Sequence, residues 1–422
     1  MEFLTGGEWK FREVAMKRDA EDLLMPVEKA GLLFRNPFII ASGPASKTVE
    51  QIQQAEQAGW GGLSIKLTFD PEPYINPAPR YRWLAEEGIH IFSLETRLNL
   101  QQGLRLVEAG RKGTKEIVIL ANITYVGEKG LSGWAEMAKQ FEEAGAHAIE
   151  LNFCCPNMSF NLDAIGETQR STPSTGASLG VSEPVVFAIT KAVKESVHLP
   201  VFAKLTPEGG NIGEVAQSAI DAGADGVCTT ANRLGVPALN IYHPQRSIYR
   251  LQEGTSLGCI SGPWLKPLAL KDVLQMRKTI GPDPVIIGTG GVHTFREAVE
   301  MALVGADLIG VCTAVMLKGF GVLSEMVKGI KKYLRETGRN SFSEIRDGAL
   351  PYFKPVTELI LIPGQAEVRE EKCVGCGRCV VIAHCEALEM AGEKAVVRKE
   401  KCLGCSTCVD VCPKGAIAMV SL

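Results

Sequence analysis

Apolar, β-branched runs alternate with amphipathic helical patterns between residues 37 and 315. The runs are almost continuously apolar, which is typical of strands buried on both faces of a parallel sheet. Several runs follow a segment that ends in glycine and a small residue, as in AEQAGWGG and FEEAGAHA, and such glycines are typical of helix C-termini. The eight predicted strands cover residues 37–42, 61–69, 116–123, 148–153, 200–206, 226–230, 284–290 and 306–315.

Eight strand–helix units in succession predict a (β/α)8 TIM barrel. A doubly wound sheet is the alternative, because periodicity alone cannot show that a sheet closes. Three connections, residues 70–115, 154–182 and 231–283, are too long for simple loops. In a barrel they would lie at the C-terminal ends of the strands, where active sites are built. Residues 157–180 are polar and rich in Gly, Ser and Thr; we expect a lid over the site, with a surface insertion as the alternative.

The repeating pattern ends near residue 335 and predicts four parts of the chain. These are an N-terminal extension (1–25), the barrel (26–335), a linker (336–370) and a C-terminal cysteine-rich module (371–422).

Composition excludes several partners. The net charge is −3, so there is no electrostatic reason to expect nucleic acid or an anionic membrane. No uncharged apolar run approaches transmembrane length, and the N-terminus is too charged for a signal peptide. We therefore expect a cytoplasmic protein.

Eight of the thirteen cysteines fall within the last 50 residues, in two clusters typical of metal ligands. The second cluster has the bacterial ferredoxin spacing Cys-x2-Cys-x2-Cys-x3-Cys-Pro, whereas the first has a longer last spacer and lacks the proline. In two-cluster ferredoxins the fourth cysteine of each run binds the other cluster. The pattern therefore predicts two [4Fe–4S] clusters, with zinc as the alternative. The first ligand set is Cys373, Cys376, Cys379 and Cys412, and the second is Cys402, Cys405, Cys408 and Cys385.

The last two predicted barrel strands carry the elements of a phosphate site. Gly290 and Gly291 allow close backbone approach to a phosphate, and Thr313 offers a hydroxyl. Lys66 and Lys204 end two other strands and could stabilise negative charge on a reduced flavin. Taken singly these are also tight turns and surface lysines, but beside iron–sulfur clusters they favour FMN. No dinucleotide-binding Gly-x-Gly-x-x-Gly follows a strand, so we expect NAD(P) to bind a partner protein.

Several segments resemble the FMN-barrel and ferredoxin parts of the dihydropyrimidine dehydrogenase family and, more distantly, dihydroorotate dehydrogenase. They are VEKAGLLFRNPFIIASGPAS, AGWGGLSIKLTF, ELNFCCPN, PVFAKLTP, ISGPWLKPLALK and GTGGV. The resemblance spans about residues 26–335 and continues through the cysteine clusters.

The resemblance implies a role for each matching residue. Cys155 matches the family's general acid/base, and Asn152 would face substrate or flavin. The residues expected to bind FMN are Ser42, Lys66, Lys204, Gly262, Gly290, Gly291, Cys312 and Thr313. A thiol near its ordinary pKa of about 8.5 is mostly protonated at pH 7 and can donate a proton to a carbon. A buried, inert thiol is the alternative, which we favour for Cys154, Cys228 and Cys259.

Two departures place a pyrimidine substrate in doubt. Ser93 stands where the pyrimidine enzymes carry asparagine, and Ala231 stands at a second such place, with Asn232 one step later. We assign Ser93 and Asn232 to substrate binding, but without the asparagines the amide edges of uracil or thymine lose their partners.

We therefore expect an FMN- and iron–sulfur-dependent oxidoreductase that reduces or forms an activated C=C bond in a small substrate. Electrons would come from an NAD(P)/flavin-binding reductase subunit or a ferredoxin-type donor, in an oligomer. The alternative is an electron-transfer subunit whose FMN only relays electrons.

Overall fold

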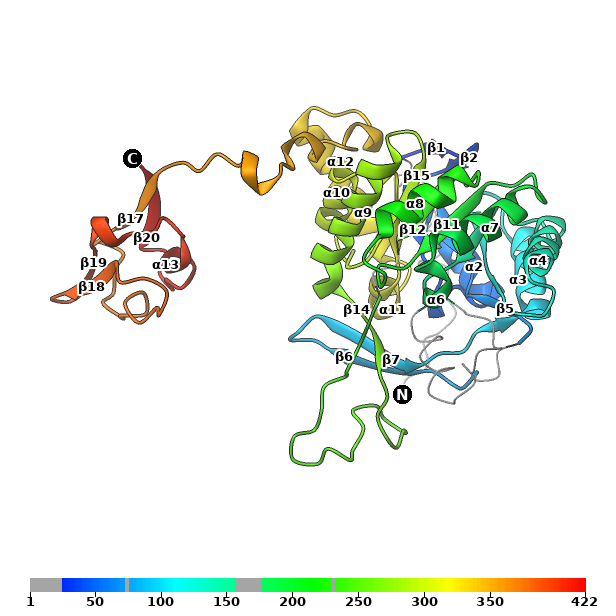
Figure 1. Ribbon diagram of the computed structural model, residues 1–422, viewed down its shortest axis with the longest axis horizontal. Helices are drawn as coiled ribbons and strands as arrows, with labels where there is room; N and C mark the ends of the chain where they lie inside the picture. The colour runs from blue at the N-terminus through cyan, green and yellow to red at the C-terminus, as the bar shows by residue number, and fades with distance from the viewer. Residues whose placement is uncertain (1–24, 73–75, 156–175, 230–231) are drawn as a thin grey trace, which may run out of the picture. The chain divides into compact units, whose positions relative to one another are not determined.

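Each of the eight apolar runs contains a parallel strand, and the eight strands close on themselves (Figure 1). In barrel order they are β3 (Phe38–Ile40), β4 (Gly62–Ser64), β9 (Val118–Tyr125), β10 (Ala148–Asn152), β11 (Val201–Leu205), β12 (Gly226–Thr229), β15 (Val285–Thr289) and β16 (Leu308–Val311). Every strand pairs with the next, and β16 pairs with β3. A doubly wound sheet would leave two open edges, so the TIM-barrel prediction is confirmed.

The structure is a computed structural model and describes residues 25–72, 76–155, 176–229 and 232–422. The contacts divide the chain into two units, Met1–Pro351 and Tyr352–Leu422. The predicted N-terminal extension, Ala231 and most of the predicted lid lie outside the described residues. Within the described part of the chain, no helix is long and apolar enough to cross a membrane.

Helices follow the strands around the barrel. The main ones are α2 (Val49–Gln57), α3 (Leu100–Gly113), α4 (Leu131–Glu143), α7 (Glu183–Lys194), α8 (Ile212–Asp221), α9 (Lys266–Ile280), α10 (Phe295–Leu303), α11 (Thr313–Lys318) and α12 (Val322–Thr337). Asn99 accepts a hydrogen bond from the backbone N–H of Gln102 and caps α3. After α10, Gly305 has φ +120°, and a Cβ there would meet the Arg277 side chain at 2.6 Å. The glycines expected at helix ends therefore allow the sharp turn into the next strand.

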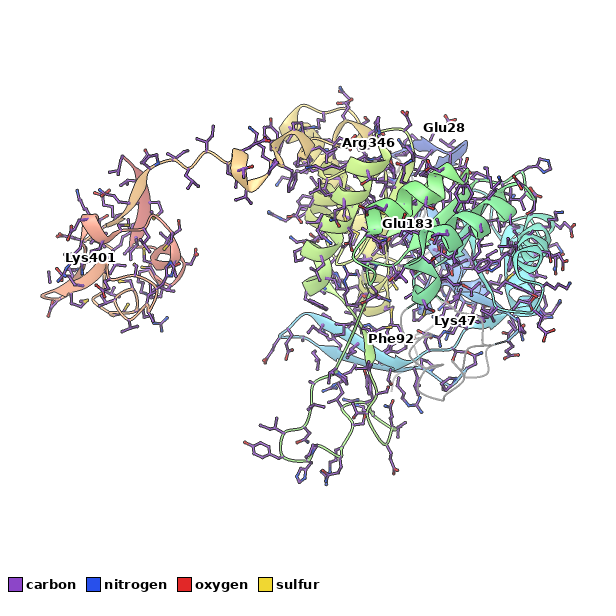
Figure 2. The ribbon with its side chains drawn as sticks, in the orientation of Figure 1. Glu28, Lys47, Phe92, Glu183, Arg346 and Lys401 are labelled. Atoms are coloured by element: carbon purple, nitrogen blue, oxygen red, sulfur yellow. The ribbon has the colours of Figure 1, made fainter. Side chains whose placement is uncertain are left out.

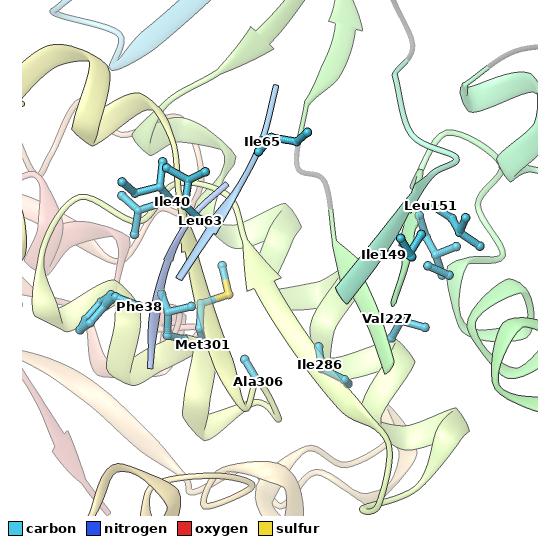
Figure 3. Packing of buried hydrophobic residues seen from close by; sticks show 14 of the residues in the cluster. Phe38, Ile40, Leu63, Ile65, Ile149, Leu151, Val227, Ile286, Met301 and Ala306 are labelled. Carbon is cyan, nitrogen blue, oxygen red and sulfur yellow. The ribbon is translucent and has the colours of Figure 1, made fainter. Parts of the chain in front are cut away.

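Side chains alternate between the two faces of each barrel strand. Phe38 and Ile40 point outward and pack with Leu63 and with Met301 of α10 (Figure 3). Ile39, between them, points into the barrel and joins an inner apolar cluster with Phe202. Hence the barrel has one apolar layer beneath the helices and another inside it.

A hairpin formed by β1 (Val27–Lys29) and β2 (Leu32–Phe34) contributes to the inner cluster. Val27 and Phe34 are buried against inward-facing residues near the starts of the strands, such as Val118 and Val285. These apolar side chains fill the N-terminal end of the barrel.

Two of the three long connections form a small sheet of their own. β6 (Arg80–Leu84) and β7 (Ile89–Leu94) come from the first, while β13 (Arg233–Gly235) and β14 (Gly258–Ser261) come from the last. They pair antiparallel in the order β13-β14-β7-β6, and Figure 1 shows β6, β7 and β14 together at one end of the barrel. This sheet brings residues that are distant in sequence beside the barrel strands.

The C-terminal unit has two antiparallel strand pairs around a small core. β17 (Gly364–Val368) pairs with β20 (Ile417–Ser421), and β18 (Leu388–Ala391) pairs with β19 (Lys394–Val397). A short helix, α13 (Thr407–Asp410), precedes β20. β17 lies within the predicted linker, 336–370, yet its partner is the last strand of the ferredoxin module. Charged side chains such as Glu28 and Lys401 are exposed on the two units (Figure 2).

Candidate active site

A cavity with several charged and polar side chains on its wall lies at the C-terminal ends of the barrel strands, where two adjoining pockets share several wall residues. The barrel gathers there eleven of the twelve site residues expected from sequence. They are Ser42, Lys66, Asn152, Cys155, Lys204, Asn232, Gly262, Gly290, Gly291, Cys312 and Thr313.

Strand alternation explains why these side chains meet. In β10, Ile149 and Leu151 face the helices, so Glu150 and Asn152 face the barrel interior. In β11, Lys204 follows the inward-facing Phe202 by two residues and has the same orientation. The inner surface thus changes from apolar near the strand starts to polar at their C-terminal ends.

A buried hydrogen-bond network surrounds the Lys204 ammonium. The Glu150 carboxylate lies 3.6 Å from Lys204 Nζ and accepts hydrogen bonds from Ser64 and Asn122. Asn152 Nδ2 donates to Asn122 Oδ1 at 2.9 Å. Burial opposes the charge on Lys204, but Glu150 raises the pKa of Lys204 above its ordinary value. Lys204 therefore remains a cation on the cavity wall.

A second buried ion pair lies across the cavity. Lys66 Nζ is 3.2 Å from Glu95 Oε2, and the Tyr81 hydroxyl donates to the same carboxylate. Burial lowers the pKa of Lys66, and Glu95 partly opposes this effect. The His90 ring stacks on Tyr81 at 5.4 Å, and burial lowers the pKa of His90 to about 4, so His90 is neutral at pH 7.

Cys155 lies just after β10, beside an arginine from the first long connection. Arg97 Nη2 is 3.6 Å from Cys155 Sγ. Leu67 and Phe69 form an apolar contact with the thiol residue. Cys154 is buried, with its Sγ 3.4 Å from Asn152 Oδ1, and it also lines the cavity. The two adjacent cysteines thus have different surroundings: Cys155 contacts Arg97, whereas Cys154 contacts Asn152 and lies near Lys204.

The part of the cavity at β15 and β16 fits a phosphate group. Gly290 and Gly291 have φ +128° and +73°, and a Cβ on Gly291 would meet the Lys266 backbone at 2.7 Å. The Thr313 hydroxyl lies 3.2 Å from Ser261 Oγ at the same pocket. Among the described residues, no well-formed hydrogen bond reaches either buried ring nitrogen of His293, although the Gly291 backbone lies close. Narrow glycine turns and these polar groups are what a flavin phosphate requires.

Ser93 is the one expected site residue that the structure does not bring to the cavity. Its neighbour Phe92 lines the cavity, and successive side chains of β7 point to opposite faces. Ser93 Oγ instead donates to Gln252 Oε1 at 2.8 Å and is fully buried. The Ser93 hydroxyl therefore contacts the connection between β13 and β14 and not the cavity.

Sequence reasoning missed several cavity residues because they come from the long connections. Tyr81, His90 and Phe92 belong to the small sheet, and Glu95 and Arg97 follow it. One sequence feature could have indicated cavity residues in this connection: the charged pair Glu95 and Arg97 directly follows the apolar IFSL. Glu150 was also missed, although it precedes Asn152 by two residues in a strand.

In the C-terminal unit the cysteines form the two sets expected from their spacing. One pocket is lined by Cys373, Cys376, Cys379 and Cys412, and another by Cys385, Cys402, Cys405 and Cys408. Backbone N–H groups donate to the sulfurs of Cys412 and Cys402 at 3.2 and 3.3 Å.

Comparisons with known proteins agree with both parts of the chain. Residues 25–334 match the dihydroorotate dehydrogenase family model, and residues 366–419 match a 4Fe-4S dicluster domain. The NAD-dependent dihydropyrimidine dehydrogenase subunit PreA of Escherichia coli K12 is 30% identical over 362 residues, covering 83% of each chain. The dihydroorotate dehydrogenase B (NAD(+)) catalytic subunit of Pyrococcus furiosus is 33% identical over 326 residues, covering 76% of this chain and 96% of that one. The chloroplastic dihydropyrimidine dehydrogenase (NADP(+)) of Arabidopsis thaliana is 26% identical over 348 residues, covering 78% of each.

Barrel, cavity and cysteine module together define a flavin- and iron–sulfur-containing oxidoreductase that acts on CH–CH groups. The chain belongs to the dihydroorotate dehydrogenase family, and it carries a 4Fe–4S ferredoxin domain. The resemblance drawn from the sequence motifs is thereby confirmed.

Proposed function

We propose that this chain reduces, or in the reverse direction forms, an activated C=C bond in a small substrate, with Cys155 transferring the proton. The observation that carries this proposal is the placement of Cys155. Its side chain lines the same cavity as Lys66 and Lys204, and this cavity adjoins the glycine turn at Gly290 and Gly291.

The cavity residues divide into three groups. Gly262, Gly290, Gly291 and Thr313 would hold the FMN phosphate end, while Ser42, Lys66, Lys204 and Cys312 would contact the remaining flavin. Asn152 and Asn232 line the cavity at the substrate side with Cys155. When bound, FMN supplies the hydride to one carbon of the double bond. The protein supplies the proton, because the Cys155 thiol can donate to the neighbouring carbon.

Glu150 supports the flavin chemistry by keeping the Lys204 side chain positively charged. Glu150 keeps Lys204 protonated, so a positive charge is available next to a reduced, negatively charged flavin. Placing the carboxylate behind the lysine maintains that charge in a buried site.

Two [4Fe–4S] clusters would bring electrons to this site. Their ligands are the two cysteine sets, each of which lines its own pocket. The donor would be a separate NAD(P)/flavin reductase subunit or a ferredoxin, in an oligomeric enzyme. Two of the relatives are named as subunits of their enzymes, which supports a multi-subunit arrangement.

Cofactor analysis tests this proposal first. Anaerobically purified full-length protein should contain about eight irons and one FMN per chain. Two zincs without acid-labile sulfide would contradict the cluster assignment.

Reduction experiments test the electron path. Dithionite should reduce the isolated chain, whereas NADH or NADPH alone should not do so efficiently. The reduced protein is then mixed anaerobically with small unsaturated compounds. Reoxidation by one of them supports the reductase, while reoxidation only by electron acceptors would favour an electron-transfer subunit.

A further inference from the structure

The surfaces around the two cysteine sets of the C-terminal unit differ in charge. The pocket of the first ligand set, which contains Cys373, has three exposed cations on its wall: Lys372, Arg378 and Lys414. Among the described residues, no carboxylate side chain lines that pocket. The pocket of the second ligand set, which contains Cys385, has no charged side chain on its described wall.

The three cations beside the first set are open to a partner. None of them forms an ion pair with another residue that the structure describes. Glu370 and Glu371 precede Lys372 in the sequence, but neither lines the pocket. A fourth cation, Lys394, instead donates to the backbone carbonyls of Glu370 and Cys373 at 3.0 and 2.6 Å. The surface of the first set therefore carries an excess of exposed positive charge.

The groove beside Cys385 of the second set shows a balanced arrangement. Its wall carries two carboxylates and two cations. Lys401 Nζ lies 2.8 Å from Glu386 Oε2, and Arg398 pairs with Glu389. These charges neutralise one another within the module, so this surface offers no comparable field to a charged partner.

Both sets otherwise present a similar small contact at the surface. Val374 is 60% exposed between two ligands of the first set, and Leu403 is 65% exposed between two ligands of the second. One ligand of each set, Cys376 or Cys405, is also exposed. A small apolar contact with a polar rim is typical of the transient interfaces of electron-transfer proteins. Charge is thus the property that distinguishes the first set.

We propose that a separate one-electron donor protein with an acidic surface docks on the first ligand set, its carboxylates pairing with Lys372, Arg378 and Lys414. This inference deepens the proposed function and rests on it, because it names where electrons enter the chain. Each docking event oxidises the donor by one electron and reduces this chain by one electron. Two such events and one proton from water supply the hydride that is transferred from FMN.

Opposite charges would act mainly on the rate at which the donor arrives. Charge complementarity raises association rates by about 10- to 1,000-fold at low salt, and the gain falls steeply as ionic strength rises. Single exposed ion pairs contribute little to affinity, typically less than about 1 kcal/mol. The oxidised donor can therefore leave quickly, as repeated one-electron transfer requires.

Stopped-flow reduction of the full-length, cofactor-loaded protein tests the inference. The probe is a reduced plant-type [2Fe–2S] ferredoxin, a small acidic protein of low potential. Its second-order rate constant with wild type should fall by about tenfold or more between about 20 and 300 mM salt. At the lower salt concentration, the triple variant Lys372→Gln, Arg378→Gln and Lys414→Gln should react about 10- to 100-fold more slowly than wild type.

A matched variant separates docking at the first set from the total charge of the module. Arg398→Gln, Lys399→Gln and Lys401→Gln removes the same number of exposed cations near the second set. It should react with ferredoxin within about threefold of wild type, because these charges lie away from the docking surface. The methyl viologen radical, a cationic reductant, should reduce the first triple variant at least as fast as wild type.

Binding provides a readout that needs no electron transfer. At low salt, the Kd for oxidised ferredoxin, measured by calorimetry, should be about tenfold weaker for the first triple variant than for wild type. Iron and FMN contents should be unchanged. If the triple variant loses its clusters, Arg378→Gln and Lys414→Gln are measured singly, and each should slow reduction by ferredoxin by about two- to fivefold.

Four results would overturn the inference. They are a ferredoxin reaction that is absent or independent of salt, equal slowing by the two triple variants, unchanged ferredoxin affinity in the first, and parallel slowing of its reaction with methyl viologen. The last result would assign the cations to the cluster potential. Failure of the proposed function would look different: ferredoxin would reduce the protein through this surface, but no unsaturated compound would reoxidise it.

Discussion

The two ends of the barrel each contain buried charges, but they use them differently. At the N-terminal end, Asp307 precedes β16 and contacts Arg277 at 2.6 Å and both Lys29 and Arg346 at 2.7 Å. Arg277 also donates to the carbonyl oxygens of Gly281, Pro284 and Gly305, so each of its nitrogens is bonded.

At the C-terminal end, the cations Lys66, Arg97 and Lys204 line a cavity, and Glu95 is the one carboxylate on its wall among the described residues. Glu150 supports Lys204 from within the barrel. The first arrangement satisfies charges within the protein and joins the hairpin, α9 and the segment after α12. The second presents charges to a ligand. Charges that stabilise the fold therefore lie at the N-terminal end of the barrel, and charges that can contact a ligand lie at the C-terminal end.

Removing the thiol should have the largest effect on activity. Cys155→Ala should lower substrate turnover by about 10²- to 10⁴-fold, the usual contribution of a positioned general acid. FMN content, iron content and reduction by dithionite should be unchanged, because none of these needs the thiol. Cys155→Ser should also be slow near neutral pH, since a hydroxyl is a much weaker acid than a thiol.

Cys154→Ser provides the matched control for that experiment and should retain activity. Stopped-flow reoxidation of the reduced protein by its substrate measures both variants. Wild-type turnover in Cys155→Ala would make the thiol structural and favour the electron-transfer alternative.

Removing the Asp307 carboxylate at the N-terminal end of the barrel should lower the free energy of unfolding without changing the active site. Asp307→Ala would remove the closer of the two carboxylates that face buried Arg277 and leave Asp347 at 3.7 Å, which should cost about 3 kcal/mol in unfolding free energy. The nearby exposed Asp283→Ala should change stability by less than about 0.5 kcal/mol. Denaturant unfolding of the FMN-loaded proteins measures this difference, and the flavin spectrum of folded Asp307→Ala should match wild type.

Neutralising Glu150 tests whether this carboxylate keeps Lys204 charged at the C-terminal end of the barrel. In Glu150→Gln the pKa of Lys204 should fall, because burial would no longer be opposed by a carboxylate. As pH rises, Lys204 should lose its proton and the flavin midpoint potential should fall more steeply than in wild type. For charges about 4 Å apart, the carboxylate changes the free energy of deprotonating Lys204 by about 4 kcal/mol at an effective dielectric constant of about 20. Potentiometric titration between pH 6 and 9 measures it, and identical slopes would argue against control by this pair.

A histidine near the start of β10 should make stability depend on pH. Burial lowers the pKa of His147 to about 4, and its Nδ1 accepts the backbone N–H of Ile119 at 2.8 Å. An unfolded histidine titrates near 6.5, so the unfolded state binds more protons between pH 6.5 and 4. Stability from this group is therefore complete above about pH 6.5 and is lost as pH falls toward 4, by about 2 kcal/mol.

His147→Asn should flatten that part of the stability profile, as measured by thermal or denaturant unfolding at several pH values. His198, whose side chain is 99% exposed, provides the control, and His198→Asn should leave the profile unchanged. A parallel loss of stability in wild type and His147→Asn would assign the effect to other groups.

The smallest effect on activity is expected at Ser93. Because its side chain bonds Gln252 on the face of β7 away from the cavity, Ser93→Asn alone should not create a pyrimidine contact. Turnover of uracil, if measurable, should stay within about threefold of wild type. A large gain would show that the asparagine reaches the substrate despite the strand alternation.

Local sequence patterns were enough to predict the barrel, the two cysteine sets and several residues of the site. Near-continuous apolar runs predict strands buried on both faces, and eight repeats of strand and helix predict the barrel. The cysteine spacing predicts the two ligand sets, because thiolates held a few residues apart in turns converge on one cluster. Residues at strand ends, such as Lys66 and Lys204, could also be predicted, since parallel strands bring their C-terminal ends to one place.

Only the tertiary structure decided how residues from the long connections complete the site. Antiparallel pairing of β7 with β14 fixes which side chains of β7 face the cavity, and a shift of one residue would exchange Phe92 and Ser93. That register depends on contacts between segments about 170 residues apart, which no local pattern records. The placement of Arg97 beside Cys155 has the same origin, since their proximity results from closure of the barrel and not from their spacing in sequence.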